Sequence, residues 1–230
     1  MRKERIGIFG GTFNPVHSGH VRAAAEIQKR FSLDRILFIP SSLPPHKTTE
    51  EIAPARDRMR MVELALRRRR RLIPSPIEVR AGGTSYSILT LKKIKKLHPR
   101  AWIFFVLGVD AFLEIETWRE WERVLEQCLF IVMTRPGYRL GAAKKVLGKT
   151  FSKKILDVRP SNRVRESWFT SFRIFCVPIR ALDVSSTDIR RRVRRGESVR
   201  DSVPPAVERY IKGHRFYLKR RLRKQPAHGH

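Results

Sequence analysis

The sequence predicts a doubly wound α/β fold, in which a parallel sheet of about five or six strands carries helices on both faces. Short apolar runs alternate along the chain with amphipathic stretches, an order typical of strand–helix units and a parallel sheet. The apolar runs are nearly continuous, as expected for strands that are buried on both faces. We therefore expect a Rossmann-like domain over residues 1–218, followed by a basic, disordered tail over 219–230.

The first unit is a strand over residues 6–11 and a helix over about 19–30. The strand, IGIFGG, is rich in Ile and Phe and ends on two glycines. Small and apolar residues recur along one face of the helix. A second strand, over 35–40, ends at a proline, and three further prolines predict a loop over 41–54.

The middle of the chain continues the pattern. An apolar stripe predicts a helix around 59–66. Residues 77–87 predict a brief strand and a Gly-Gly loop, and a second stripe predicts a helix over about 88–99. Residues 102–110 form the most apolar run and predict a central strand.

The last third is less even. Residues 118–127 predict a helix, and 128–137 predict a buried strand that ends in a Pro-Gly turn. Residues 138–172 are irregular and basic, which favours an insertion. Residues 173–178 predict the last strand, and a final helical region begins within 185–196.

Composition excludes several classes of protein. A hydrophobic share of 41% in 230 residues is ordinary for a globular domain and excludes a disordered or fibrous chain. Cys128 and Cys176 lie inside apolar runs, so we expect buried thiols rather than a disulfide framework, and a reducing cytoplasm. No apolar run approaches 18 residues, so we expect no contact with a membrane interior.

The charge is the unusual quantity. Fifty Lys and Arg stand against 21 Asp and Glu, a formal net charge of +29. Such an excess indicates an anionic partner, either nucleic acid, anionic lipid or small phosphorylated molecules, or else a basic solvated surface.

The segment from Gly10 to His20 joins the first strand to the first helix. Glycines let the backbone approach a ligand, and a helix start offers free N–H groups with a partial positive charge. His17 and His20 are three residues apart, so both side chains point from the first turn toward the same place. These features predict a phosphate site with two imidazole donors. A metal site would need further ligands nearby, and a structural role for both histidines is the other alternative.

The string GGTFNPVHSGH resembles the T/H-x-G-H nucleotidyltransferases, and most closely the bacterial nicotinate-nucleotide adenylyltransferases. The resemblance extends over about residues 5–218. Further motifs of that family follow in order: PPHK (44–47), SYSILTL (85–91), LGVD (107–110) with Trp118, RPG (135–137) and VSSTDIR (184–190).

The resemblance implies an enzyme that joins nicotinate mononucleotide to ATP, giving deamido-NAD and pyrophosphate, with Mg²⁺ accompanying ATP. It implies three catalytic residues, His17, His20 and Arg190. It implies ATP contacts at Gly10, Gly11, Thr12, Phe13, His17, His20, Gly108, Asp110, Ser186, Thr187 and Arg190. It implies mononucleotide contacts at Lys47, Ser87, Trp118 and Arg135, with backbone N–H groups near Ser87 and Trp118 receiving the nicotinate carboxylate. Metal ligands and oligomeric state are not predicted.

The implied reaction needs no activated hydroxyl. The nucleophile is a phosphate oxygen, and a phosphate monoester is largely dianionic at pH 7 because its second pKa is ~6. Catalysis therefore requires alignment of the attacking and leaving oxygens on the α-phosphorus, and positive donors that offset the repulsion between two anions.

Some features depart from the family. Ser87 replaces the usual Thr, Asn14 stands where many relatives have Asp, and the excess charge is unexplained. Alternatives within the superfamily are adenylyl transfer to nicotinamide mononucleotide or to phosphopantetheine. An alternative of another class is a nucleic-acid-binding protein, based on the basic runs 67–71 and 190–195 and on the tail. Nucleic-acid binding as a side property stays open.

Overall fold

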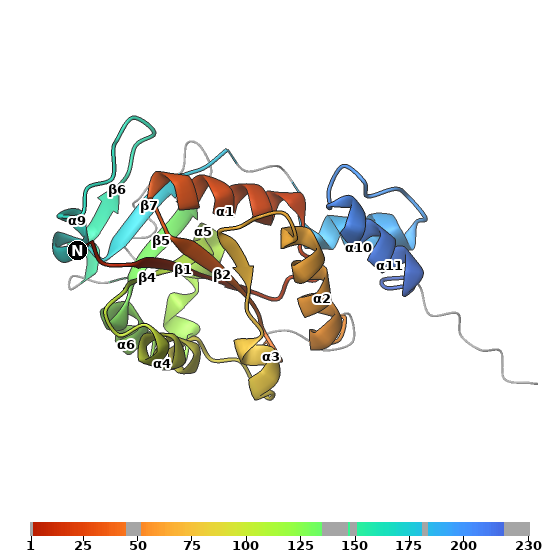
Figure 1. The fold of residues 1–230 in the computed structure, drawn as a ribbon, viewed down its shortest axis with the longest axis horizontal. Coiled ribbons are helices and arrows are strands. Elements are labelled where there is room, and N and C mark those ends of the chain that lie inside the picture. Colours follow the sequence, from red (N-terminus) through yellow and green to blue (C-terminus); the bar gives the residue numbers. More distant parts are fainter. Residues whose placement is uncertain (1, 45–51, 135–146, 148–150, 181–183, 219–230) are drawn as a thin grey trace, which may run out of the picture.

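A computed structural model describes residues 2–44, 52–134, 147, 151–180 and 184–218. These residues contain a seven-stranded sheet in the order β3-β2-β1-β4-β5-β7-β6, and every pair of neighbours is parallel (Figure 1). The strands are β1 (Arg5–Gly11), β2 (Arg35–Pro40), β3 (Leu72–Pro74), β4 (Trp102–Gly108), β5 (Leu129–Thr134), β6 (Ile155–Asp157) and β7 (Ile174–Pro178).

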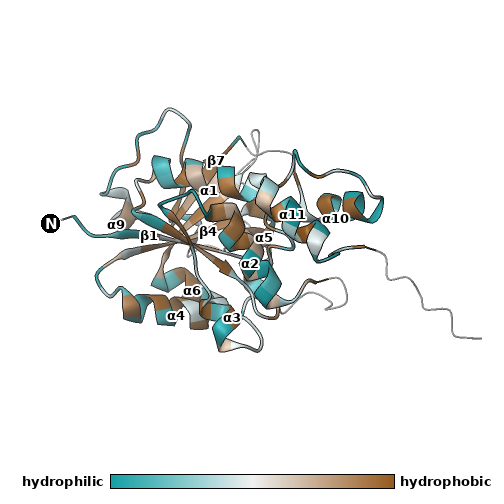
Figure 2. Ribbon diagram, turned by 45° about the vertical axis from the view of Figure 1, so that its right-hand side comes forward, coloured by the Kyte–Doolittle hydropathy of each residue, from teal (hydrophilic) through white to brown (hydrophobic). Residues whose placement is uncertain are grey.

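Helices cover both faces of this sheet, with their apolar sides toward it (Figures 1 and 2). One face carries α1 (Ser18–Arg30), α2 (Ala55–Leu66) and α9 (Trp168–Ser171). The same hydrophobic core extends past α2 to α10 (Ser186–Arg194) and α11 (Pro205–Gly213), which lie beyond the sheet (Figure 1). The other face carries α4 (Ser87–Leu97), α5 (Val109–Leu113), the 3₁₀ turn η2 (Ile115–Thr117) and α6 (Trp121–Gln127). A short helix, α3 (Ile77–Ala81), follows β3. The predicted doubly wound α/β architecture is confirmed.

Each face has its own hydrophobic core, which explains why the central strands are apolar at nearly every position. Along β4, Phe104 and Val106 pack on the α1 side, while Phe105 and Leu107 pack on the α4 side. Alternate side chains of a strand point to opposite faces, so a strand in the middle of this sheet needs an apolar residue at each position.

Three sequence expectations need correction. The sheet has seven strands rather than five or six, because β3 and β6 are edge strands of three residues each. Residues 77–81 form a helix and not a strand; Pro76 is its N-cap, and the strand lies just before it. The region 138–172 is not wholly an irregular insertion, since β6 and α9 lie in its described part.

The chain changes direction across the sheet between β1 and β4. From β1 it runs outward to β2 and β3, and from β4 it runs on the other side to β5 and the edge strand β6, before β7 returns between them. In such sheets the crevice for a ligand lies beyond the carboxyl ends of the strands at this switch point. Gly11 ends β1 and Gly108 ends β4, so both predicted glycine sites border that crevice.

Two further expectations concern thiols and membranes. Cys128 and Cys176 are buried free thiols, and burial raises the pKa of both. In the described part of the chain, no helix is long and apolar enough to cross a lipid bilayer.

Candidate active site

A cavity of about 650 Å³ opens at the carboxyl ends of β1 and β4. Its walls come from the first loop, from the segment after β2, from the start of α4 and from the turn before α6. Its lining includes Gly10, Gly11, Thr12, Glu78, Ser85, Ser87 and Trp118. A Cβ placed on Gly10 would contact only the Phe105 ring, at 3.8 Å. This wall is therefore open to a ligand because glycine has no side chain to occupy the space.

His17 and His20 form a reciprocal pair at the start of α1. His17 is the N-cap, and its Nδ1 accepts from the His20 backbone N–H at 3.3 Å. The His20 Nδ1 accepts in turn from the His17 backbone N–H at 3.3 Å. The two rings stack with centroids 3.6 Å apart. A capping box of two histidines is thus the local reason that both imidazoles have fixed positions.

These hydrogen bonds also fix the protonation of the two rings. An imidazole whose Nδ1 accepts a hydrogen bond carries its proton on Nε2 when it is neutral. Burial lowers the pKa of His17 to about 4, and burial together with the neighbouring His17 lowers the pKa of His20 well below its ordinary value. Both rings are therefore neutral near pH 7, and each has one Nε2–H donor to offer.

The first loop is held in place by α10. The Ser186 hydroxyl donates to the Pro15 carbonyl at 2.9 Å, and the Arg190 guanidinium donates to the Asn14 carbonyl at 3.0 Å. Ser185 caps α10 by accepting from the Asp188 N–H at 3.1 Å. The structure thus places the predicted residues Ser186 and Arg190 against the first loop, although 171 and 176 residues separate the bonded pairs.

Arg58 holds the same loop from behind, and no sequence motif identified it. Its side chain is 1% exposed, and its three nitrogens donate to the carbonyls of Ala53, Thr12 and Ser42, each at 2.8 Å. Burial lowers the pKa of this guanidinium. Arg58 therefore ties the loop after β1 to the loop after β2. The helical spacing of Arg58 with the buried Met61 and Val62 was the available signal.

Asn14 anchors the loop to the end of the described chain. Its Oδ1 accepts from the Ala53 N–H at 3.1 Å and from the Tyr217 hydroxyl at 2.8 Å. The Asn14 side chain is buried, so these two donors satisfy an oxygen that is shielded from water. The residue noted as a departure from the family therefore has a defined structural role.

In the opposite wall of the cavity, hydrogen bonds join the segment after β2 to the segment before α4. The Ser42 N–H donates to the Ser85 hydroxyl at 2.8 Å, and residues 43 and 84 pair as a parallel bridge. Glu78 accepts from the Thr90 hydroxyl at 2.5 Å and from Ser85, while burial raises its pKa. The SYSILTL motif is thus fastened to α3, and this positions Ser87 at the cavity.

The start of α4 faces the cavity without a cap. Its N-cap, Tyr86, makes no side-chain capping bond, and the N–H groups of Leu89 and Thr90 donate to the Tyr86 carbonyl. Within the described residues, the N–H groups of Ser87 and Ile88 have no acceptor. The first turn of an 11-residue helix therefore presents free donors and a partial positive charge beside Trp118.

Trp118 supplies an aromatic wall. Its half-buried ring lines the cavity and packs edge-on against Phe105, with centroids 5.5 Å apart. Its backbone N–H donates to the Ile115 carbonyl at 2.9 Å, within the turn of η2. Of the two N–H groups that the resemblance implies for a carboxylate, the one at Trp118 is therefore already occupied, whereas the one at Ser87 is free.

The remaining predicted residues lie as follows. The Phe13 side chain is buried against Phe9 and Phe38, so only its backbone could meet a ligand. Thr187 accepts from Arg190, and Gly108 and Asp110 begin α5 at the end of β4. Lys47 and Arg135 lie outside the described residues.

A metal cage was not predicted. In the described ranges, no group of three His, Cys, Asp or Glu side chains could hold a metal ion.

Comparison with known proteins places this geometry in a family. Residues 8–192 match the cytidylyltransferase-like family. A "Probable nicotinate-nucleotide adenylyltransferase" of Desulfatibacillum aliphaticivorans is 40% identical over 218 residues, covering 93% of this chain and 100% of that protein. One of the same description from Geotalea uraniireducens is 38% identical over 213 residues, covering 93% and 98%.

A solved structure has the same fold. It is that of Plasmodium falciparum nicotinic acid mononucleotide adenylyltransferase complexed with NaAD, with a TM-score of 0.68 at 19% identity, over 93% of this chain and 97% of that one. At this identity the likeness concerns the fold alone.

Proposed function

This chain belongs to the cytidylyltransferase-like family and, within it, to the nicotinate-nucleotide adenylyltransferases, and we propose that it catalyses the reaction for which those relatives are named. It joins the phosphate of nicotinate mononucleotide to the α-phosphorus of ATP and releases pyrophosphate. The product is deamido-NAD, a precursor in NAD synthesis. The observation that carries the choice of substrate is the uncapped N-terminus of α4 at the wall of the cavity.

The ATP side is built on the first loop. Gly10, Gly11 and Thr12 border the cavity, and the two glycines, which lack side chains, let the triphosphate lie along the backbone. The Nε2–H groups of His17 and His20 donate to its phosphates. The start of α10, with Ser186, Thr187 and Arg190, supplies further donors, a partial positive charge and a full one. Gly108 and Asp110 lie on the adenosine side.

The mononucleotide side is the wall formed by α4 and η2. Trp118 stacks on the pyridine ring, and the free N–H groups of Ser87 and Ile88 receive the carboxylate of nicotinate. A carboxylate accepts from both donors and is stabilised by the helix dipole. The amide of nicotinamide can only accept through its oxygen and carries no charge, so it binds this turn less well. Lys47 and Arg135 stay proposed contacts of the mononucleotide phosphate.

The reaction follows from positioning and charge. A dianionic phosphate oxygen attacks the α-phosphorus; a new P–O bond forms, and the bond to the β-phosphate oxygen breaks as pyrophosphate leaves with the electron pair. No proton has to be removed from the nucleophile, which agrees with two neutral histidines. Their Nε2–H groups, together with Arg190, bind the charge that develops on the transferred phosphate.

Mg²⁺ enters the reaction as part of the ATP substrate. The protein side chains of the described cavity do not form a metal cage, so no step is assigned to an ion held by the protein. A cytoplasmic location and a domain boundary at residue 218 stay predictions, and residues 219–230 lie outside the described part.

The test is a product assay with matched variants. Purified protein is incubated with ATP, Mg²⁺ and nicotinate mononucleotide, nicotinamide mononucleotide or phosphopantetheine, and pyrophosphate and dinucleotide are quantified. We expect equal amounts of pyrophosphate and deamido-NAD, and a kcat/KM at least ~10-fold higher for the acid than for the amide, since a charge-assisted hydrogen bond is worth about 1.5–3 kcal/mol. No pyrophosphate with nicotinate mononucleotide would show that the proposal is wrong.

Ser87→Pro tests the carboxylate site itself. Proline is tolerated at the first position of a helix but has no N–H, so this variant removes one donor without breaking α4. The acid should lose its advantage over the amide, whereas Ser87→Ala, which keeps the N–H, should retain it. Equal selectivity in the two variants would show that the carboxylate binds elsewhere.

A further inference from the structure

Five consecutive arginines, Arg67, Arg68, Arg69, Arg70 and Arg71, connect α2 to β3; we call these residues the arginine run. All five are exposed. The adenylyltransferase site uses none of them, because they lie at the amino end of β3, and the cavity lies beyond the carboxyl ends of the strands. Their concentration in one short turn therefore has no explanation in the reaction.

The backbone of the arginine run is firmly placed. The Arg69 N–H donates to the Leu66 carbonyl at 2.8 Å, and the Leu72 N–H donates to the Arg69 carbonyl at 3.1 Å. The Arg71 carbonyl accepts from the Ile36 N–H at 2.8 Å. Both flanking residues, Leu66 and Leu72, are buried, with 3% and 4% exposure. The five guanidinium groups are thus presented from an ordered turn, which lowers the entropy lost on binding.

No carboxylate of the described residues neutralises this cluster. Among the described residues, no Asp or Glu lies within ion-pairing distance of any of the five arginines. The acidic residues nearest in sequence or in strand register are engaged elsewhere: Glu63 with Arg60 at 2.9 Å, Asp34 with Arg2, and Glu4 with Arg35. Five like charges in one turn repel each other, so binding of an anionic partner would reduce this electrostatic repulsion.

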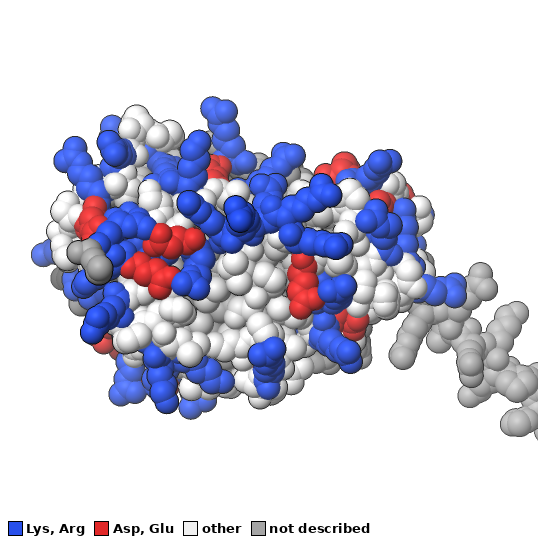
Figure 3. Space-filling model, viewed as in Figure 1, with Lys and Arg blue, Asp and Glu red and all other residues white. Residues whose placement is uncertain are grey.

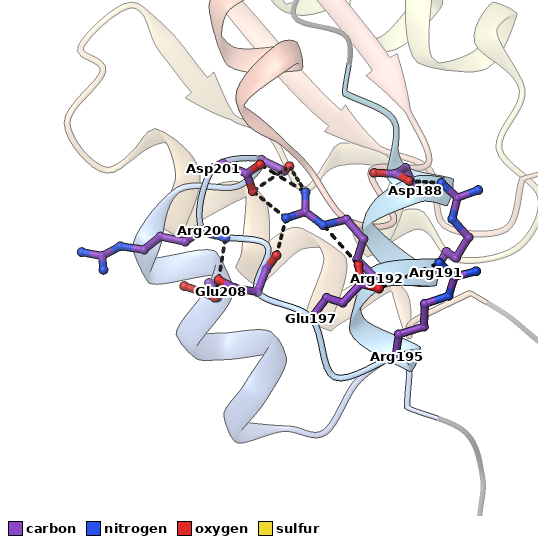
Figure 4. Close-up of polar contacts among 10 residues, drawn as sticks. Asp188, Arg191, Arg192, Arg195, Glu197, Arg200, Asp201 and Glu208 are labelled. Atoms are coloured by element: carbon purple, nitrogen blue, oxygen red, sulfur yellow. Dashed lines mark hydrogen bonds and ion pairs between the residues drawn. The ribbon is translucent and has the colours of Figure 1, made fainter.

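The other basic run of the described chain, residues 190–195, differs because several of its arginines pair with carboxylates (Figure 4). On α10, Arg191 pairs with Asp188, and Arg192 pairs with Asp201 at 3.0 Å. Arg195 pairs with Glu197 at 3.8 Å. Much of the charge of run 190–195 is therefore satisfied within the molecule, and the arginine run is the stronger candidate for an external anion. Figure 3 shows Lys and Arg side chains gathered over the connection between α2 and β3.

We propose that the arginine run binds the phosphodiester backbone of nucleic acid without reading its sequence. The run lies at the amino end of the edge strand β3, whereas the catalytic cavity lies at the carboxyl ends of the strands. Guanidinium groups bind phosphate oxygens through two parallel N–H donors, and all five positions carry Arg rather than Lys. A membrane surface fits less well. The exposed large apolar side chains in the described chain are Leu43, Leu89, Leu97 and Leu218, and none belongs to the run or its anchors.

The test is the salt dependence of binding to a labelled 20-base-pair DNA duplex, followed by fluorescence anisotropy with the full chain. The first variant combines Arg67→Gln, Arg68→Gln, Arg69→Gln, Arg70→Gln and Arg71→Gln. The control removes five exposed cations away from the run, three on α4, one just after it and one before β6, through Lys92→Gln, Lys95→Gln, Lys96→Gln, Arg100→Gln and Lys153→Gln. Both variants carry the same net charge, so they separate a defined site from general attraction.

We expect the first variant to bind at least ~10-fold more weakly at 0.1 M salt. The slope of log Kd against log salt should fall by about 3 to 4.5, since each phosphate contact contributes about 0.9. The control should change that slope by less than about 1. Both variants should keep the melting temperature and the adenylyl-transfer rate of the parent protein, and excess ATP should not displace the duplex.

Three outcomes would overturn the proposal. An equal loss in both variants would mean that binding follows net charge alone. Displacement of the duplex by ATP would place it in the catalytic cavity. Binding of vesicles containing anionic lipid that depends on the arginine run, with no such dependence for the duplex, would identify a membrane surface instead.

Discussion

The Nδ1 atom of His17 accepts from the backbone N–H of His20, while the Nδ1 atom of His20 accepts from the backbone N–H of His17. One motif thereby caps α1, stacks two imidazoles 3.6 Å apart and leaves the proton of each neutral ring on Nε2. The arrangement gives both histidines a structural role at the start of α1, and their catalytic role stays a prediction that is compatible with it.

His20 allows the two roles to be separated. His20→Asn keeps an acceptor near the position of Nδ1 and so retains the capping bond, but it has no Nε2–H. We expect kcat to fall by at least ~10²-fold, because losing one transition-state donor costs about 2.7–4 kcal/mol. His20→Ala, which also loses the acceptor of the His17 backbone N–H, should show a similar kcat and a lower melting temperature. A near-normal kcat for His20→Asn would show that the donor is dispensable.

The low pKa of His17 makes stability depend on pH. The folded pKa is about 4, and the ordinary value is 6.5, so between these pH values the unfolded chain binds more protons than the folded one. The contribution is complete above pH 6.5 and is lost as pH falls toward 4. We expect about 2 kcal/mol of unfolding free energy to be lost between pH 7.5 and pH 5 through this group.

Urea unfolding of wild type and of His17→Asn at several pH values measures this contribution. The variant should lose less stability on acidification than the wild type does. Parallel pH profiles for the two proteins would contradict a buried, neutral His17.

Arg58 should affect both substrates at once. Arg58→Met leaves three carbonyls without donors, on the loops after β1 and β2 and at the start of α2. An unsatisfied buried group costs about 1–3 kcal/mol, so we expect the unfolding free energy to fall by at least ~3 kcal/mol. The KM values for ATP and for the mononucleotide should both rise, and Arg58→Lys should not restore them, because an ammonium group cannot reach three separate carbonyls.

Arg60→Met is the matched control, since Arg60 lies on the same helix but is exposed and pairs only with Glu63 among the described residues. Its unfolding free energy should change by less than ~1 kcal/mol, with both KM values unchanged. If Arg58→Met loses stability but keeps both KM values, Arg58 supports the fold without positioning the loops.

Trp118 should affect only the mononucleotide. Trp118→Ala removes an aromatic contact worth ~0.5–1.5 kcal/mol beyond its buried area, so the KM for nicotinate mononucleotide should rise roughly 10-fold. The KM for ATP should stay the same. Trp121→Ala is the control, because Trp121 packs on Phe151, with centroids 6.4 Å apart, and does not line the cavity. A rise in KM for both substrates would contradict stacking on the pyridine ring.

Local patterns predicted much of this molecule. Continuous apolar runs predicted the central strands, and the three-residue spacing of His17 and His20 predicted the pair at the start of α1. Both predictions were possible because each pattern lies within one element. The strand β3 escaped prediction, since Leu72–Pro74 is short, follows five arginines and ends on proline. Residues 77–81 have the alternation of a strand, yet they form a helix whose Glu78 reaches Thr90.

Long-range partners could not be read from the sequence. Arg58 bonds to Thr12, 46 residues away, and Tyr217 bonds to Asn14, 203 residues away. No local periodicity specifies such contacts, which depend on how the elements pack. For the same reason, Phe13, implied as an ATP contact, has its side chain in the core.

In the proposed reaction the two substrates react directly across the first loop, and no adenylyl group is passed to the protein. The most direct measurement uses ATP that is chirally labelled at the α-phosphorus and determines the configuration of that phosphorus in deamido-NAD. A single in-line displacement predicts inversion of configuration. Retention would require two successive displacements through a covalent adenylyl-enzyme, and it would contradict this account.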